Sequence, residues 1–270
     1  MLKQRIITAC LLLPWVIAAV LFLPSPYFAG ISGFIFLCGI WEWTSLAGFS
    51  SLLSRLGSMF LFPLITLLLM IILHRLGRAV LEEGLFLFIA AFWLFVLYGL
   101  YRYPKNLLFS KSPSIGLISG AIALIPAWFL LVALQYKDPR YALYILVLVW
   151  VADSSAYFIG KRFGTHKLAL AISPGKTWEG ALGACIVSIF VIGIAYTILK
   201  PNTSFLSWQV LGLLAVIFSI IGDLFESAYK RVRNLKDSGR LLPGHGGVLD
   251  RIDSLTAAIP IFTIGFMFLN

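Results

Sequence analysis

The chain has 270 residues, of which hydrophobic residues make up 60% and charged residues only 12%, with a formal net charge of +10 at pH 7. This composition excludes an ordinary soluble domain and indicates that lipid is the solvent for most of the chain. The positive charge suits anionic lipid head groups or a polyphosphate substrate, so nucleic acid need not be invoked as a partner.

Apolar runs of membrane-spanning length follow one another, separated by short breaks that contain charged residues, glycine or proline. They predict an all-α polytopic membrane protein with about nine transmembrane helices. The first run follows Lys3 and Arg5, but no small-residue cleavage site comes after it, so we expect a retained helix and not a signal peptide. The predicted spans are about 5–23, 27–47, 56–73, 85–101, 114–135, 141–160, 180–199, 206–226 and 254–269.

The distribution of Lys and Arg predicts the orientation. With the N-terminus in the cytoplasm, 16 of the 21 Lys and Arg residues fall in cytoplasmic segments, since only Arg75, Arg78, Lys137, Arg140 and Lys200 lie outside. This bias favours a cytoplasmic N-terminus and an external C-terminus in the cell (plasma or inner) membrane.

The two halves of the chain differ in their acidic residues. Residues 1–140 contain four acids and are predicted to form a hydrophobic helical scaffold. Residues 141–270 contain the other seven, in or beside two cytoplasmic connections at about 161–179 and 227–253, and are predicted to carry the chemistry. The cysteines (Cys10, Cys38 and Cys185) occur singly in apolar runs, which argues against a disulfide framework or a zinc site.

The first connection begins with Asp153, inside the sixth predicted span. A carboxylate there needs a cation, a metal ion or a proton, and a structural partner on a neighbouring helix is an alternative. Gly175, Lys176 and Thr177 suggest a phosphate loop, but the Walker pattern also requires glycine at position 170, which is leucine. We instead expect Ser173 and Pro174 to start a helix, with Lys176 as a phosphate contact; helix capping alone explains the serine and proline equally well.

The second connection begins inside the eighth span, where Asp223, Glu226 and Ser227 share one helix face and Lys230 continues it. The glycines further on, Gly246 among them, allow close approach of the backbone to a ligand and expose N–H groups to anions. A simpler reading of the basic residues from 230 to 240 is a positive-inside anchor.

Asp250 and Asp253 are three residues apart, so at the start of the ninth span they are expected to share a helix face. Two carboxylates so close repel each other unless a positive group lies between them, and oxygen ligands of this kind select hard cations such as Mg²⁺. The alternative is that both acids complement the positive end of a helix. His245, between glycines, could be a turn residue, and Arg251 could pair with an acid.

The residues of the second connection resemble the signature of phosphatidate cytidylyltransferases (CDP-diacylglycerol synthases). A similar likeness covers Asp153, Ala156, Tyr157, Phe158, Ile159 and Gly160, and Ser173, Pro174, Lys176, Thr177, Trp178, Glu179 and Gly180. The departures are Tyr229, where an aliphatic residue or Phe is usual, and Ser154 with Ser155 in place of Thr-Gly. The matching signature positions are Ser227, Lys230, Arg231, Lys236, Asp237, Gly239, Leu242, Pro243, His245, Gly246, Gly247, Val248, Asp250, Arg251, Ile252 and Asp253.

The resemblance implies synthesis of CDP-diacylglycerol and pyrophosphate from CTP and phosphatidic acid with Mg²⁺, alone or with a second cation. Membrane lipid is then a partner; a homodimer is compatible with so much uncharged surface, although no motif argues for one. The residues implied as catalytic are Asp223, Lys230, Arg231, Lys236, Asp237, His245 and Arg251; as substrate-binding Ser173, Lys176, Thr177, Glu179, Ser227, Gly246 and Gly247; and as metal ligands Asp223, Asp250, Asp253, Asp153 and Glu226.

Two other classes of protein compete with this prediction. A CTP-dependent polyprenol or phytol kinase would transfer the γ-phosphoryl group to an alcohol and release CDP instead of pyrophosphate. A solute transporter would usually show related halves with charges at the bilayer midplane. Here the halves are dissimilar and the acids gather at one face, which disfavours the transporter.

Overall fold

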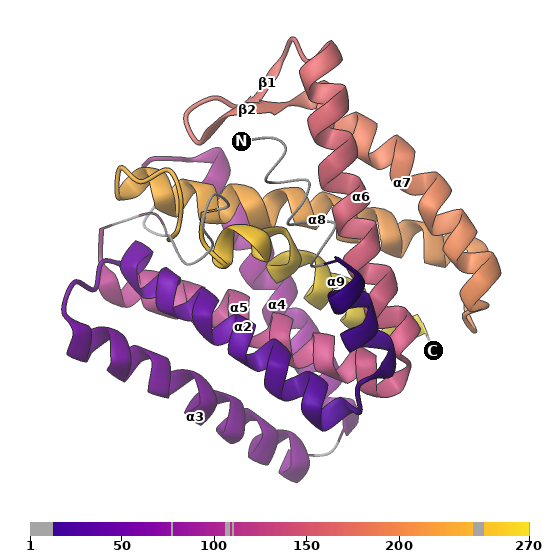
Figure 1. Ribbon diagram of the computed structural model, residues 1–270, viewed down its shortest axis with the longest axis horizontal. Helices are drawn as coiled ribbons and strands as arrows, with labels where there is room; N and C mark the ends of the chain where they lie inside the picture. Colours follow the sequence, from indigo (N-terminus) through magenta and orange to yellow (C-terminus); the bar gives the residue numbers. More distant parts are fainter. Residues whose placement is uncertain (1–12, 77, 106–108, 110, 240–245, 270) are drawn as a thin grey trace.

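The computed structural model describes residues 13–76, 78–105, 109, 111–239 and 246–269, with only the backbone for residues 67 and 69–83. Most of this part of the chain is α-helical (Figure 1). After a short helix, Leu13–Phe22, the elements in chain order are α2 (Ser25–Ala47), α3 (Leu52–Leu76), α4 (Arg78–Tyr101), α5 (Pro113–Lys137), α6 (Pro139–Phe163), β1 (Lys167–Ala169), β2 (Ser173–Thr177), α7 (Trp178–Leu199), α8 (Phe205–Val232), the 3₁₀ helix η2 (Leu249–Arg251) and α9 (Asp253–Leu269).

Each predicted span coincides with a helix in the described residues, and residues 5–12 of the first predicted span lie outside them. Six helices there are long and apolar enough to cross a membrane: α2, the part of α4 from residue 84, α5, α6, α7 and α8. Two shorter apolar helices are Leu13–Phe22 and α9, and the first part of α3, Leu52–Thr66, is apolar as well. Helices suit lipid because each satisfies its own backbone hydrogen bonds. The predicted all-α, multi-pass architecture is therefore confirmed, while the sides on which the termini lie stay a prediction.

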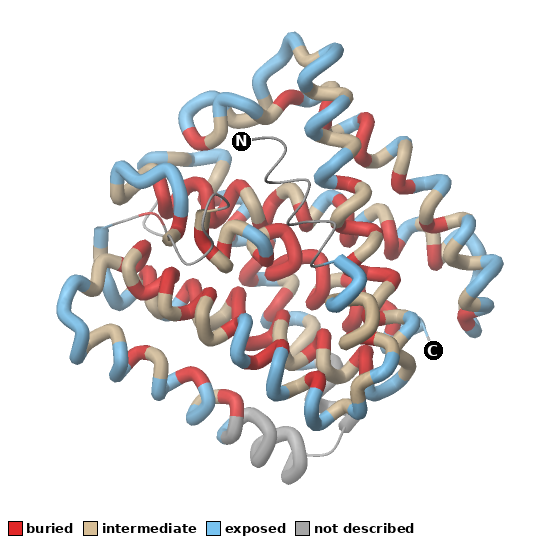
Figure 2. Tube along the Cα trace, in the orientation of Figure 1, coloured by how far each residue is buried: buried red, intermediate tan, exposed pale blue. Residues whose placement is uncertain are grey.

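The helices pack as three pairs around a buried centre. Helix α8 packs on α9, α6 on α7, and α2 on α5, with α9 also against α5 (Figure 1). Figure 2 shows buried residues running through the middle of the bundle, and α9 is buried continuously from Ser254 to Pro260. On the periphery, α7 exposes an apolar row at every fourth position, as expected of a helix that faces lipid. The row consists of Leu182, Ile186, Phe190, Ile194 and Ile198.

The connection between α6 and α7 differs from the prediction. Residues Ser173–Thr177 form strand β2, which pairs with β1 in a two-stranded antiparallel sheet at the end of α6 (Figure 1). The expectation that Ser173 and Pro174 start a helix is wrong, because these residues pair with β1 and α7 begins only after the last strand residue. Thr177 caps that helix, since its Oγ1 accepts a hydrogen bond from the Gly180 N–H at 3.2 Å.

Helix α8 extends to Val232, six residues beyond the predicted end of its span at about 226, so Ser227 and Lys230 are helical. Aromatic packing fixes this end of α8 against α2: the Trp43 ring lies 5.3 Å from the Phe225 ring and 4.9 Å from the Tyr229 ring. The ends of α2, α6 and α8 that are predicted to face the cytoplasm lie together with the starts of α7 and α9.

Candidate active site

Four polar side chains form one face of α8 near its C-terminal end, as the spacing predicts. Ser227 Oγ donates a hydrogen bond to Asp223 Oδ1 at 3.2 Å. One turn further on, Lys230 Nζ lies 3.1 Å from Glu226 Oε1. Glu226 and Lys230 are buried, with 2% and 7% of their surface exposed. Because buried charges require partners, this face is a pre-arranged set of charges and not a solvated surface.

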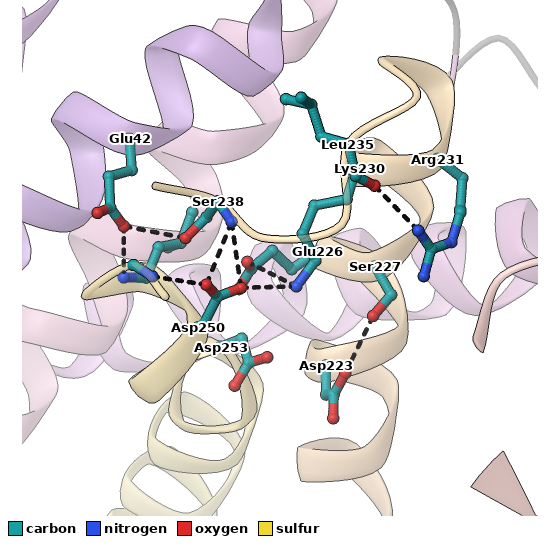
Figure 3. A network of polar contacts seen from close by, with 12 residues as sticks. Glu42, Asp223, Glu226, Ser227, Lys230, Arg231, Leu235, Ser238, Asp250 and Asp253 are labelled. Carbon is teal, nitrogen blue, oxygen red and sulfur yellow. Dashed lines mark hydrogen bonds and ion pairs between the residues drawn. The ribbon is translucent and has the colours of Figure 1, made fainter. Parts of the chain in front are cut away.

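Asp250, from η2, completes the pairing of Lys230. Lys230 Nζ donates to Asp250 Oδ1 at 2.8 Å, while Oδ2 accepts the backbone N–H groups of Ser238 at 3.1 Å and Gly247 at 2.8 Å (Figure 3). Burial alone would raise the pKa of Asp250, but the Lys230 ammonium and these N–H groups outweigh it and place that pKa below its ordinary value. Asp250 is therefore held as a carboxylate.

Asp253 is the first residue of α9, two residues after η2 ends at Arg251. Asp250 and Asp253 do not lie in one continuous helix, because the chain forms a 3₁₀ turn around Asp250 before α9 begins. Asp253 Oδ1 accepts the N–H of Ser254 at 2.7 Å, and Ser254 Oγ donates to Asp153 Oδ1 at 3.4 Å. The start of α9 thus brings Asp153 of α6 to the same cluster.

The hairpin of β1 and β2 contributes a second lysine. Lys176 Nζ of β2 lies 2.7 Å from Asp223 Oδ2, and it also interacts electrostatically with Asp153 and Asp253. Arg231 fixes the hairpin against α8, since its Nε donates to the Ile172 carbonyl oxygen at 2.9 Å. The structure therefore joins the two predicted connections into one site, with a lysine from each side among the acids.

Several predicted site residues have contacts that shape the backbone. Glu179 Oε1 accepts hydrogen bonds from Thr165 Oγ1 at 2.7 Å and from the His166 N–H at 3.1 Å, which closes the base of the hairpin. Arg231 also donates from Nη1 to the Leu235 carbonyl oxygen at 2.9 Å. Ser173 is half-buried, Lys236, Asp237 and Arg251 are exposed, and His245 lies outside the described residues.

Gly246 and Gly247 fold tightly around Asp250. Gly246 has a φ of +83°, which favours glycine, and a Cβ there would lie 2.7 Å from Asp250 Oδ2. A Cβ on Gly247 would overlap Ser238 Oγ and Glu42 Oε2. In the structure these glycines therefore serve the geometry of Asp250; their predicted contact with a nucleotide stays a prediction.

The sequence prediction did not include Glu42, which lies in the half described as scaffold. This residue is 2% exposed, and its Oε2 accepts hydrogen bonds from Ser238 Oγ at 3.0 Å and from the Leu249 N–H at 2.8 Å (Figure 3). An acid inside an apolar span is itself a signal of function, and that signal was available in the second span.

The acids outnumber the cations that contact them. The cluster holds five carboxylates against the ammonium groups of Lys176 and Lys230, and Glu226 Oε2 is buried without a hydrogen-bond partner among the described residues. In the arrangement of this part of the chain, no three acids, histidines or cysteines stand close enough to hold a metal ion. The donor chemistry nevertheless fits a hard divalent cation. The five acids are Asp153, Asp223, Glu226, Asp250 and Asp253.

Comparison with known proteins agrees with this chemistry. A protein named phosphatidate cytidylyltransferase from Haemophilus influenzae is 39% identical over 290 aligned positions, which cover 99% of each chain. One of the same name from Pseudomonas aeruginosa is 41% identical over 265 positions, covering 97% of this chain and 96% of its own. One from Staphylococcus aureus strain COL is 43% identical over 46% of this chain. The model of the cytidylyltransferase family matches residues 3–269, and this chain belongs to that family.

Proposed function

We propose that this membrane protein is a phosphatidate cytidylyltransferase, which makes CDP-diacylglycerol and pyrophosphate from CTP and phosphatidic acid. The name shared by two relatives that align over nearly the whole chain supports this activity. One structural observation carries the assignment of the site: the ion pairs Lys176–Asp223 and Lys230–Asp250 bring three distant segments into one cluster of acids and lysines.

The reaction needs positioning and charge neutralisation more than covalent catalysis. A phosphatidate oxygen attacks the α-phosphorus of CTP, a new P–O bond forms, and the bond to the bridging oxygen of the β-phosphate breaks as pyrophosphate leaves. We assign Lys176 and Lys230 to the phosphate groups that meet there, because each ammonium group already lies where anionic oxygens would gather. Arg231 holds the hairpin that carries Lys176, as its bond to the Ile172 carbonyl supports.

We assign Asp223, Asp250 and Asp253, with Asp153 and Glu226, as the residues that would hold Mg²⁺. The excess of carboxylates over lysines and the unpartnered Glu226 Oε2 support this assignment. A bound divalent ion would neutralise phosphate charge and orient the two anionic substrates. Within the protein, Asp250 is kept ionised by Lys230 and by backbone N–H groups, so it is ready to accept a cation.

We place the site on the cytoplasmic side of the bacterial inner membrane, where CTP is available. The excess of Lys and Arg in the segments at this end of the bundle supports the orientation. Phosphatidate would then enter sideways from the cytoplasmic leaflet.

The activity is tested with purified protein, radiolabelled CTP, phosphatidic acid and Mg²⁺. We expect pyrophosphate release together with a lipid product that carries CMP. Asp250→Asn and Asp253→Asn should abolish turnover while the protein still folds and inserts, and Asp138→Asn, at the α5–α6 junction away from the cluster, is the matched control. Release of CDP would indicate a lipid kinase instead, and near-normal turnover in both cluster variants would contradict the metal assignment.

Metal binding is tested separately from activity by thermal melting. Because a ligand that binds only the folded state stabilises it, by about 2.7 kcal/mol at a hundred times its Kd, Mg²⁺ should raise the melting temperature of the wild-type protein. Asp223→Asn should lose most of that increase. An equal increase in this variant would show that the ion binds elsewhere.

A further inference from the structure

Glu42 contacts both ends of the segment that presents Asp250. Its Oε2 accepts one hydrogen bond from the side chain of Ser238, before the loop, and another from the backbone N–H of Leu249, at the start of η2. The same Ser238 uses its backbone N–H to bind Asp250. One buried oxygen on α2 therefore fixes two of the positions that set the environment of Asp250.

The space around Glu42 is closed by glycines of the same segment. A Cβ on Gly239 or on Gly247 would overlap the Glu42 carboxylate. Gly247 in turn donates its N–H to Asp250 Oδ2 at 2.8 Å. The backbone thus approaches Glu42 closely on both sides of the loop, an approach that only glycine permits at these two positions.

Helix α2 holds this carboxylate rigidly. The adjacent Trp43 stacks on Phe225 and donates from Nε1 to the Gly116 carbonyl oxygen at 2.7 Å. At the end of α2, the carbonyl oxygens of Leu46, at 3.0 Å, and of Ala47 accept hydrogen bonds from Arg233, which joins the end of α2 to the end of α8. Glu42 and Lys230 are therefore carried by two helices that are joined by an aromatic stack and by hydrogen bonds at their ends.

We propose that Glu42 is a positioning residue of the cytidylyltransferase: through Ser238 and η2 it holds Asp250 against Lys230 in the geometry that the reaction requires. The inference rests on the proposed role of Asp250. Glu42 itself touches none of the reacting groups, so its removal should act on turnover through the placement of Asp250. Outer partners of this kind typically contribute tenfold to a hundredfold in activity or metal affinity.

The test compares variants of Glu42 with a variant of its neighbour Trp43. Glu42→Ala should lower kcat roughly tenfold to a hundredfold and raise the Mg²⁺ concentration needed for half-maximal activity, with little change in KM for phosphatidate. Glu42→Gln keeps an oxygen that can accept both hydrogen bonds, so it should recover most of the kcat. Trp43→Phe should lower the melting temperature and leave the Mg²⁺ requirement unchanged.

Ser238→Ala covers the case in which Glu42→Ala does not fold. Ser238→Ala removes one of the two hydrogen bonds to Glu42 and should also lower kcat. When it is combined with Glu42→Gln, the fold-loss in kcat should be smaller than the product of the fold-losses in the two single variants. If the wild-type protein turns over and both Ser238→Ala and Glu42→Ala keep its kcat and its Mg²⁺ requirement, the positioning role alone is overturned. A wild-type protein without turnover would overturn the proposed function as well.

Discussion

Replacing Lys230 by methionine tests whether the buried charges stabilise the protein as the structure indicates. The substitution keeps an unbranched side chain of similar length but removes the ammonium group that lies 3.1 Å from Glu226 Oε1 and 2.8 Å from Asp250 Oδ1. Both carboxylates would then face each other inside the bundle without that cation. Breaking a buried ion pair by removing one partner costs about 3–5 kcal/mol.

The expected loss can be measured as a melting temperature. Since 1 kcal/mol corresponds to about 2–4 °C in a domain of this size, Lys230→Met should melt roughly 6–20 °C below the wild-type protein in the same detergent. Lys236→Met is the matched control, because Lys236 is exposed and surface substitutions usually stay within about 0.5 kcal/mol.

A second substitution separates charge from packing. Asp250→Asn, added to Lys230→Met, removes one of the two carboxylates that have lost their cation. The amide oxygen of the asparagine can still accept hydrogen bonds from the N–H groups of Ser238 and Gly247. The double variant should therefore melt at a higher temperature than Lys230→Met alone. If Lys230→Met melts within about 2 °C of the wild-type protein, the reasoning from buried charge is refuted.

Four further tests, one of them with its own control substitution, examine other parts of the structure. Gly247→Ala should lower stability by about 1–3 kcal/mol and lower turnover, because its Cβ would overlap two neighbouring side chains, whereas Gly175→Ala, whose Cβ would meet open space, should melt like the wild-type protein. Asp138→Ala should cost about 1 kcal/mol at pH 7 through the lost cap of α6, measured by thermal melting. A hydrogen bond from the Arg140 side chain holds the pKa of Asp138 below its ordinary value. The stability lost in Asp138→Ala should therefore be largest above a pH of about 4 and should vanish as the pH falls through the lowered pKa. Arg233→Lys should cost about 2 kcal/mol, because an ammonium group cannot bind three carbonyl oxygens in a fork; an unchanged melting temperature would contradict this. Tyr229→Phe removes a buried hydroxyl that lies 2.6 Å from a serine hydroxyl and should cost about 1 kcal/mol, with packing unchanged in near-ultraviolet circular dichroism.

The sequence predicts the helices well because the signal for each one lies within the segment itself. A run of apolar residues long enough to cross a bilayer can satisfy its own backbone hydrogen bonds only as a helix, whatever its neighbours in the fold are. The same locality explains the success on α8, where spacings of three and four place Asp223, Glu226 and Ser227 on one face.

The failures concern features that depend on contacts distant in the sequence. Ser173 and Pro174 satisfy the local pattern of a helix start, but pairing with β1 and the bond from Arg231 to the Ile172 carbonyl favour a strand there. Glu42 meets Ser238 and Leu249 across 196 and 207 positions of sequence. No pattern within a window of the chain can contain such a contact.

The two lysines offset part of the repulsion within the acid-rich cluster. Five carboxylates brought together would repel one another, and each ammonium group offsets that repulsion at one side of the cluster. Lys230 belongs to the bundle, but Lys176 comes from the hairpin, which contacts α8 through Arg231. The charge balance of the cluster therefore depends on where the hairpin lies, and an anion that drew Lys176 away from Asp223 would leave that carboxylate open to a cation. Under the proposed assignment of these residues, we therefore expect the placement of the hairpin to couple the binding of phosphate groups to the binding of a metal ion.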